Sequence, residues 1–386
     1  MSPARRIGAT GFGLIAVCYG FARFAFGLFL PQIDAELQLG SSLGGVISGG
    51  SFFGYCIAIV LSAWATERMG ARRVAIAAAA VAAIGMAGIA LAPSPLMLAA
   101  AVMVAGSSTG LASPPMAAAV AAAVRPERQD VTNTVINAGT SAGVALSGPI
   151  ALALAGQWRL AFGAFSAVAA LLLVAVARTI PSERGGEAPG GIPPLGGPVR
   201  RLIGASFLMG MASTALWSFG SELVASRLGW SSPGAGLLWT LIGAGGIAGA
   251  FAGSLVIRFG LLRVHLTFLA LMAAGILAVG SAFTFPGSTL IGGALFGAAY
   301  VMLTGVYLIW GVRALADRPA TGLMIGFMTI AVGQTAGAPL FGFLLDEMGA
   351  GLAVTAFAAI ALVSGIFTPG GVAAPAGTPA ERQGPA

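Results

Sequence analysis

Residues 63–73 read Ala63-Trp-Ala-Thr-Glu67-Arg68-Met-Gly70-Ala-Arg72-Arg73, and they separate two apolar segments near 43–65 and 74–92. Each segment is about as long as the roughly 20 residues that an α-helix needs to cross the hydrocarbon core of a bilayer. A short polar loop between two such segments is typical of a chain that crosses a membrane and turns back. The same alternation continues along the rest of the sequence.

The composition indicates that lipid is the main solvent of this chain. Of the 386 residues, 58% are hydrophobic and 8% are charged, and the mean hydropathy is +0.95. A soluble domain carries roughly 25% charged residues, so this chain has too few to cover a water-facing surface. Cys18 and Cys56 both lie in apolar segments and predict no disulfide framework, and a single histidine, His265, argues against a metal site.

Gly, Pro and charged residues punctuate the chain at intervals that predict twelve spanning helices. The first apolar segment is too long for the core of a signal peptide. A Gly/Pro-rich linker at 180–199 divides the chain into an N-terminal half of six helices (1–179) and a C-terminal half of six helices (200–368), followed by a disordered tail at 369–386. The fold class is therefore an all-α membrane protein. We expect helices near 7–30, 43–65, 74–92, 96–123, 131–155, 159–178, 201–226, 234–257, 264–285, 287–312, 321–345 and 351–368.

The basic residues predict the orientation in the membrane. All 19 of them are arginine, and sixteen fall in segments on the side of the two termini. Two, Arg159 and Arg227, fall on the other side, and Arg23 lies inside the first helix. Because cytoplasmic loops carry an excess of basic residues, we predict that both termini are cytoplasmic, in a bacterial inner membrane. The net charge of +7 then reflects topology and not nucleic-acid binding.

The two halves repeat each other. A shift of 190 residues places Arg68 on Arg258 and Gly70 on Gly260, and the same shift relates other landmarks along the chain. Two parallel six-helix repeats are one way in which transporters build a central binding site at the interface between the repeats. The matched pairs are Arg68 and Arg258, Gly70 and Gly260, Arg73 and Arg263, Val74 and Val264, Arg128 and Arg318, Gly143 and Gly333, and Pro149 and Pro339.

The loop at 63–73 resembles the signature loop of the major facilitator superfamily, Gly-x-x-x-Asp-Arg-x-Gly-x-Arg-Arg/Lys, with Ala63 and Glu67 in place of the glycine and the aspartate. The resemblance implies a twelve-helix transporter that works by alternating access, with no enzymatic activity, cofactor or metal. It also implies that this loop is part of a cytoplasmic gate that stabilises the outward-facing state. The gating candidates are Glu67, Arg68, Gly70, Arg72, Arg73 and Arg128. The alternative is that the arginines are only topology signals.

The fifth helix carries Gly139, Gly143, Gly148 and Pro149, which look like a degraded form of the glycine/proline motif of superfamily antiporters. This favours proton-linked export and a resemblance to the arabinose-efflux-permease-like, drug–proton antiporter-like branch. Close helix packing through small residues explains the same pattern without export. The fourth helix reads Gly106-Ser-Ser-Thr-Gly110, without the arginine that many exporters carry there.

Arg23 is the most informative single residue. It lies about 17 residues after Arg6, or roughly 25 Å along a helix, which places it inside the membrane. A charge at this depth costs several kcal/mol unless it faces water or a partner. Arg23 either faces a central cavity and attracts an anionic or zwitterionic group, or is a structural arginine that snorkels or pairs with Glu222.

Further substrate-binding candidates come from polar and aromatic stripes at helical spacing. On the fifth helix, Asn133, Asn137, Thr140 and Ser141 follow one face, and on the tenth helix Tyr300, Thr304 and Tyr307 do the same. The alternative is that these side chains only form hydrogen bonds between helices. With Arg23, the full set of candidates is Tyr19, Asn133, Asn137, Ser141, Trp217, Tyr300, Thr304, Tyr307 and Trp310.

The sequence thus predicts a secondary transporter for a small organic solute, working as a monomer, with proton-linked export as the first alternative. The second is uptake or exchange of an organic anion bound through Arg23. Glu222 is the candidate proton carrier. A chain without lysine has no phosphate-binding loop for ATP. A transporter-like sensor without flux is a remote alternative.

Overall fold

The computed structural model describes residues 2–154, 156–182 and 195–370, and these residues form helices joined by short turns. The N-terminal half contains α1 (Pro3–Ile15), the π-helix η1 (Ala16–Phe24), α2 (Ala25–Leu37), α3 (Gly40–Met69), α4 (Ala71–Leu91), α5 (Pro95–Ala123), α6 (Pro126–Ala153) and α7 (Trp158–Thr179). The C-terminal half contains α8 (Gly197–Trp217), α9 (Gly220–Leu228), α10 (Ser232–Gly246), the 3₁₀-helix η2 (Ile247–Phe251), α11 (Ala252–Phe259), α12 (Leu261–Gly280), α13 (Pro286–Ala314), α14 (Pro319–Val363) and η3 (Ser364–Ile366).

These elements make twelve passes, which confirms the predicted count. Ten helices of the described chain are long and apolar enough to cross a membrane, and α8 with α9 forms one more candidate span, bent by 47°. The last of the ten contains two passes, because α14 turns at Gly349, where φ is +79°. The ninth helix ends earlier than predicted, at Gly280, because a turn precedes Pro286.

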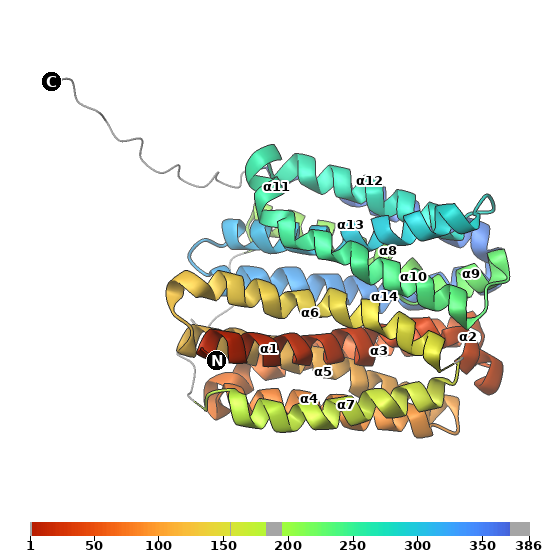
Figure 1. The fold of residues 1–386 in the computed structure, drawn as a ribbon. Helices are drawn as coiled ribbons and strands as arrows, with labels where there is room; N and C mark the ends of the chain where they lie inside the picture. The colour runs from red at the N-terminus through yellow and green to blue at the C-terminus, as the bar shows by residue number, and fades with distance from the viewer. Residues whose placement is uncertain (1, 155, 183–194, 371–386) are drawn as a thin grey trace.

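The helices of both halves run side by side, with their turns gathered at two ends of the bundle (Figure 1). We call the end that carries Arg68, Arg128 and Arg258 the arginine face, and the end that carries Glu36, Glu222 and Asp346 the acidic face. The halves meet mainly where α3 packs on α14 and α6 packs on α10. Large apolar side chains such as Leu96 (82% exposed) and Leu171 (74% exposed) cover the outside of the bundle, as expected for a surface in lipid.

The internal repeat is visible in the backbone. Gly70 ends α3 with φ +86° and ψ 154°, and Gly260 ends α11 with φ +83° and ψ 152°. Only glycine adopts such a conformation without strain, which explains why both repeats keep it at this turn. The chain therefore makes a tight turn at the same place in each half. Part of the predicted linker (183–194) and the predicted disordered tail from 371, with Arg184 and Arg382, lie outside the described residues.

Candidate functional site

A cavity of about 250 Å³ lies between the two halves, near the middle of the bundle. Its walls come from η1, α3 and α6 of the N-terminal half and from α10, η2, α13 and α14 of the C-terminal half. Arg23 is the one charged residue among those that line it. The lining is otherwise aromatic, aliphatic, glycine or hydroxyl- and amide-bearing, as is usual for a small-molecule site.

The π-helix η1 brings Arg23 to this cavity together with Tyr19. A π-helix has more residues per turn than an α-helix, so two residues four positions apart lie closer to one line along its axis. Tyr19 and Arg23 are four positions apart, and both side chains line the cavity. Single π-turns within α-helices are frequent at functional sites. Arg23 is only 6% exposed, and four rings lie within 6 Å of its guanidinium carbon, the closest being that of Tyr55 at 4.5 Å.

The hydrogen-bond partner of Arg23 is a neutral side chain from the other half. Its Nη2 donates to Oε1 of Gln334 at 2.6 Å, and the Gln334 amide nitrogen donates to the hydroxyls of Ser213 and Tyr300, each at 3.2 Å. Nε of Arg23 is buried without a partner. No carboxylate oxygen of the described residues lies within 4 Å of this guanidinium. The cavity therefore carries one uncompensated positive charge.

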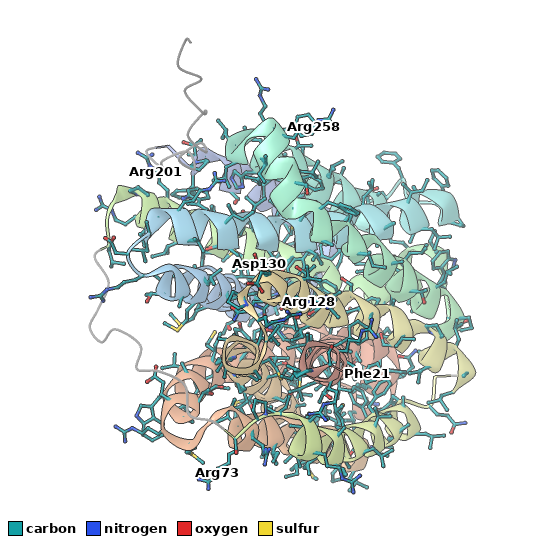
Figure 2. The ribbon with its side chains drawn as sticks, turned by 60° about the vertical axis from the view of Figure 1, so that its left-hand side comes forward. Phe21, Arg73, Arg128, Asp130, Arg201 and Arg258 are labelled. Atoms are coloured by element: carbon teal, nitrogen blue, oxygen red, sulfur yellow. The ribbon has the colours of Figure 1, made fainter. Side chains whose placement is uncertain are left out.

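The cavity opens toward the arginine face. Thr134 and Asn137, which line it on that side, are exposed. Figure 2 shows the neighbouring Arg128 and Asp130 nearer the middle of the molecule, whereas Arg73, Arg201 and Arg258 lie toward its periphery. Beyond Arg23, in the direction of the acidic face, Phe24, Trp217 and Gln334 are buried and fill the space between the halves.

The acidic face is closed by contacts between the halves. The Asp346 carboxylate accepts hydrogen bonds from the backbone N–H groups of Ser41 (3.2 Å) and Ser42 (2.7 Å) in the first turn of α3. Oγ of Ser41 donates to Oε1 of Glu222 at 2.6 Å. Deeper in the interface, the hydroxyls of Ser48 and Ser218 lie 2.6 Å apart. A negative charge is stabilising at a helix N-terminus, so the Asp346 carboxylate stabilises this contact between α14 and the first turn of α3. We call this contact the latch.

A family profile described as Major Facilitator Superfamily matches residues 12–196, and the twelve-helix fold with a repeated half and a central cavity extends over both halves. The chain has the major facilitator fold. No curated protein sequence matched it.

Solved structures similar to this chain show the same fold. A mutant form of the nucleoside transporter NupG is 13% identical with a TM-score of 0.78, over 95% of this chain and 98% of that one. A bacterial homolog of the human lysosomal transporter Spinster, inward-facing and occupied, is 16% identical with a TM-score of 0.75, over 95% and 96%. The human organic anion transporter MFSD10 is 20% identical with a TM-score of 0.66, over 95% and 100%.

Six of the predicted binding residues line this cavity, whereas four do not. Tyr307 is fully buried with its hydroxyl 3.4 Å from Oγ of Ser364, and Trp310 packs against His265. Trp217 lies behind the wall, stacked on Phe24 at 4.2 Å. Asn133 is half-buried, one turn from Asn137. The residues placed at the cavity are Tyr19, Arg23, Asn137, Ser141, Tyr300 and Thr304.

Tyr307 and Trp310 lie away from the cavity because the cavity-facing side of α13 does not centre on Tyr300. At about 100° per residue, the other lining positions 301, 304, 305 and 308 lie roughly 40–140° ahead of Tyr300 around the helix. Tyr307 and Trp310 lie roughly 20° and 80° behind it, so they turn toward α12. Tyr300 marks one edge of the cavity-facing side.

The alternative that paired Arg23 with Glu222 is contradicted. Arg23 binds Gln334, and Glu222 accepts its hydrogen bond from Ser41 at the acidic face. The sequence placed Arg23 inside the membrane but could not show that Glu222 lies beyond the bend between α8 and α9. Thr140, which the sequence placed on the polar face of the fifth helix, also lines the cavity. Sequence reasoning missed Gln334, Tyr55 and Thr134, because polar residues in glycine- and alanine-rich helices carry no signal that separates a cavity wall from a helix contact.

The predicted gating residues lie at the arginine face, toward which the cavity opens. Nε of Arg72 donates to the carbonyl of Ile180 at 2.6 Å, so it holds the end of α7 within the N-terminal half. The Arg68 guanidinium lies over the Trp64 ring at 4.5 Å. Arg73 and Arg128 are exposed, and Glu67 is half-buried. The hydrogen bonds and ring contacts described for this group thus stay within one half in this conformation.

Proposed function

We propose that this transporter carries a small organic anion with a compact apolar body, bound through Arg23 in the central cavity. The observation that supports this most strongly is the buried Arg23 guanidinium, which has a neutral hydrogen-bond partner and a buried Nε–H without any partner. A buried, unpaired donor on a charged group costs about 1–3 kcal/mol or more, which a ligand oxygen recovers. The name of one structural relative, a human organic anion transporter, agrees with this substrate class.

The shape of the lining also fits an amphipathic anion. Aromatic rings of Tyr19, Phe24 and Tyr55 border the charged end of the cavity. Away from Arg23, the C-terminal half contributes a wall of small and aliphatic residues that includes Gly246 and Ala250. A substrate with its carboxylate at Arg23 and its apolar group against this wall matches both ends of the cavity.

The test is counterflow in proteoliposomes that contain the purified protein. The panel comprises aromatic and aliphatic monocarboxylates, their neutral amides, and lipophilic cations. We expect a monocarboxylate to exchange, and Arg23→Ala to slow its exchange roughly tenfold or more, because a hydrogen bond to a charged group is worth about 1.5–3 kcal/mol. Arg200→Ala, which removes an exposed arginine outside the cavity, is the matched control and should exchange normally. Transport of cations that Arg23→Ala leaves intact would contradict the proposal.

Proton-linked export is the second candidate, and Glu222 favours it. Its carboxylate is half-buried and accepts a hydrogen bond from Ser41 across the two halves, so gain of a proton would alter a contact that must break when the acidic face opens. An inward proton gradient should then drive export of the substrate, and Glu222→Gln should uncouple the two. Substrate movement that ignores the gradient in the unmodified protein would rule this candidate out. An export role would place the chain in the drug–proton antiporter-like branch.

We also propose the cellular setting and the cycle. The arginines gathered at one end of the bundle support an inner-membrane location with both termini and the arginine face in the cytoplasm. The cavity would then be inward-open, and the two halves would rock about it in a monomer, with Glu67, Arg68 and Arg72 closing the arginine face in the opposite state. A membrane-impermeant thiol reagent should reach Arg73→Cys only after inverted vesicles are made; labelling from the outside of intact cells would reverse the orientation.

A further inference from the structure

Gln334 occupies a position that decides the charge of the cavity. It lies on α14, is fully buried, and is the described hydrogen-bond partner of the Arg23 guanidinium, across the interface between the halves. Its amide oxygen accepts from Arg23, and its amide nitrogen donates to Ser213 and Tyr300. A flipped amide would place its NH₂ group against the guanidinium, donor against donor, so the network fixes the orientation.

We infer that Gln334 is the specificity-determining residue of this site: it holds Arg23 with a neutral acceptor, and thereby reserves the positive charge for a monoanionic substrate. This inference rests on the proposed function and deepens it. A carboxylate at this position would lie at ion-pair distance from the guanidinium and cancel its charge. The Gln334 amide orients Arg23 equally well but leaves the positive charge of the guanidinium in place. A substrate carboxylate can then form a charge-assisted hydrogen bond with Arg23, which is stronger than the bond to the neutral amide.

The surroundings of Arg23 limit the substrate to a single negative charge. Arg23 is the one charged residue in the lining, so a second carboxylate would enter the cavity without a partner. Burying an unpaired charge is strongly unfavourable. The Tyr300 hydroxyl, which accepts from Gln334 and lines the cavity, keeps its own proton free to donate to the bound anion. The class recognised is therefore a monocarboxylate or a similar monoanion.

The test measures the charge of the cavity directly and needs no knowledge of the substrate. A bimane label is attached to Asn137→Cys, which is exposed in the cavity wall, in a background with Cys18→Ser and Cys56→Ser. Quenching by iodide, a monoanion, is compared with quenching by neutral acrylamide at constant ionic strength. One unit charge at about 10 Å changes the local iodide concentration roughly twofold at the dielectric constant of bulk water, and more at the lower effective dielectric constant of a cavity.

We expect Gln334→Glu and Arg23→Leu each to lower iodide quenching at least roughly twofold, and Gln334→Leu to leave it unchanged, because only the first two remove the net charge. Acrylamide quenching should stay constant in all variants, which shows that the cavity is still formed and accessible. The same label at Glu347→Cys, exposed on the acidic face, is the matched control and should respond to none of the changes.

Three outcomes would overturn this inference, and they separate its failure from the failure of the proposed function. If Arg23→Leu lowers iodide quenching but Gln334→Glu does not, Gln334 does not set the charge, and the inference is overturned while the anion site stands. If Arg23→Leu also has no effect, the guanidinium does not control the cavity, and both fail. If Gln334→Leu lowers quenching as much as Gln334→Glu does, Gln334 only positions Arg23, and the role in charge selection is overturned.

Discussion

The two ends of the interface between the halves differ in the groups that lie there, which are backbone atoms at one end and long charged side chains at the other. At the acidic face, backbones of opposite halves touch: an added Cβ at Gly45 would collide with the carbonyl oxygen of Ala338, and one at Gly342 with that of Ser41. Hydroxyls and carboxylates complete these contacts, as in the Ser48–Ser218 pair. At the arginine face, long charged side chains such as Arg73 and Arg128 are exposed, and the cavity is open.

This difference indicates how the halves separate at each end. Glycine-mediated contact buries backbone at a short distance and tolerates no added atom, so it forms one tightly defined closed state. Exposed ion pairs are worth only about 0–1 kcal/mol each, because water solvates both partners well. The arginine face can therefore open at low cost, while opening of the acidic face requires many close contacts to break together.

The strongest way to test the comparison is to lock the closed end. In a background with Cys18→Ser and Cys56→Ser, Ser48→Cys and Ser218→Cys should form a disulfide on oxidation, because their hydroxyl oxygens lie 2.6 Å apart. We expect counterflow of the transported anion to fall at least roughly tenfold in the oxidised protein and to recover on reduction, since alternating access requires this end to open. Equal counterflow in the oxidised and reduced protein would show that the closed end stays closed throughout transport.

A smaller change should hinder closure without a covalent bond. Gly45→Ala places a methyl group against the backbone of Ala338, and overpacking of this kind typically costs about 1–3 kcal/mol. We expect the Ser48→Cys/Ser218→Cys disulfide to form roughly five- to a hundredfold more slowly in this variant. Gly50→Ala, on the same helix where an added Cβ meets no atom within 4 Å, is the control and should keep the original rate. A similar delay in both variants would mean that the effect comes from the helix and not from the contact.

The smallest effects on the rate of disulfide formation should come from the removal of single charges. Removal of a charge at one end should slow the reaction, and removal at the other end should speed it. Asp346→Asn weakens the latch on α3 by about 0.3–1 kcal/mol, so the same disulfide should form roughly two- to fivefold more slowly. Glu67→Gln weakens the proposed gate at the arginine face, favours the conformation described above, and should speed disulfide formation by a similar factor. Glu347→Gln, an exposed carboxylate beside the latch, is the control. A shift of the same sign in both test variants would contradict the two-ended arrangement.

The sequence was sufficient for the fold because the signals that specify it are local and repeated. The twelve passes follow from the length of the apolar segments, and the two halves follow from the 190-residue repeat, whose glycines Gly70 and Gly260 share one unusual backbone conformation. Arg23 was found because a charge in an apolar segment stands out against its surroundings. In the described chain, Gly349 is the one place where the turn between two passes is so short that a single helix, α14, contains both passes.

The rest of the site could not be predicted because it depends on how helices rotate and tilt against each other. The tenth pass shows this, since an error of a few tens of degrees moves Tyr307 from the cavity to the contact with α12. The role of Gln334 is harder still to predict, because it depends on a hydrogen bond to Arg23, which lies 311 residues away in the sequence. The π-helix that widens the first pass has no composition that distinguishes it from an α-helix.

That widened segment, η1, has a consequence for comparing this chain with other transporters. Relative to a continuous α-helix, an i→i+5 pattern accommodates extra residues in the same length, so positions before Ala16 and after Phe24 do not share one helical register. An alignment drawn without a gap through the first pass would assign residues beyond it to faces that are wrong by about 100° for each residue of offset. Counterparts of Arg23 in other chains should therefore be sought by superposition in space and not by column.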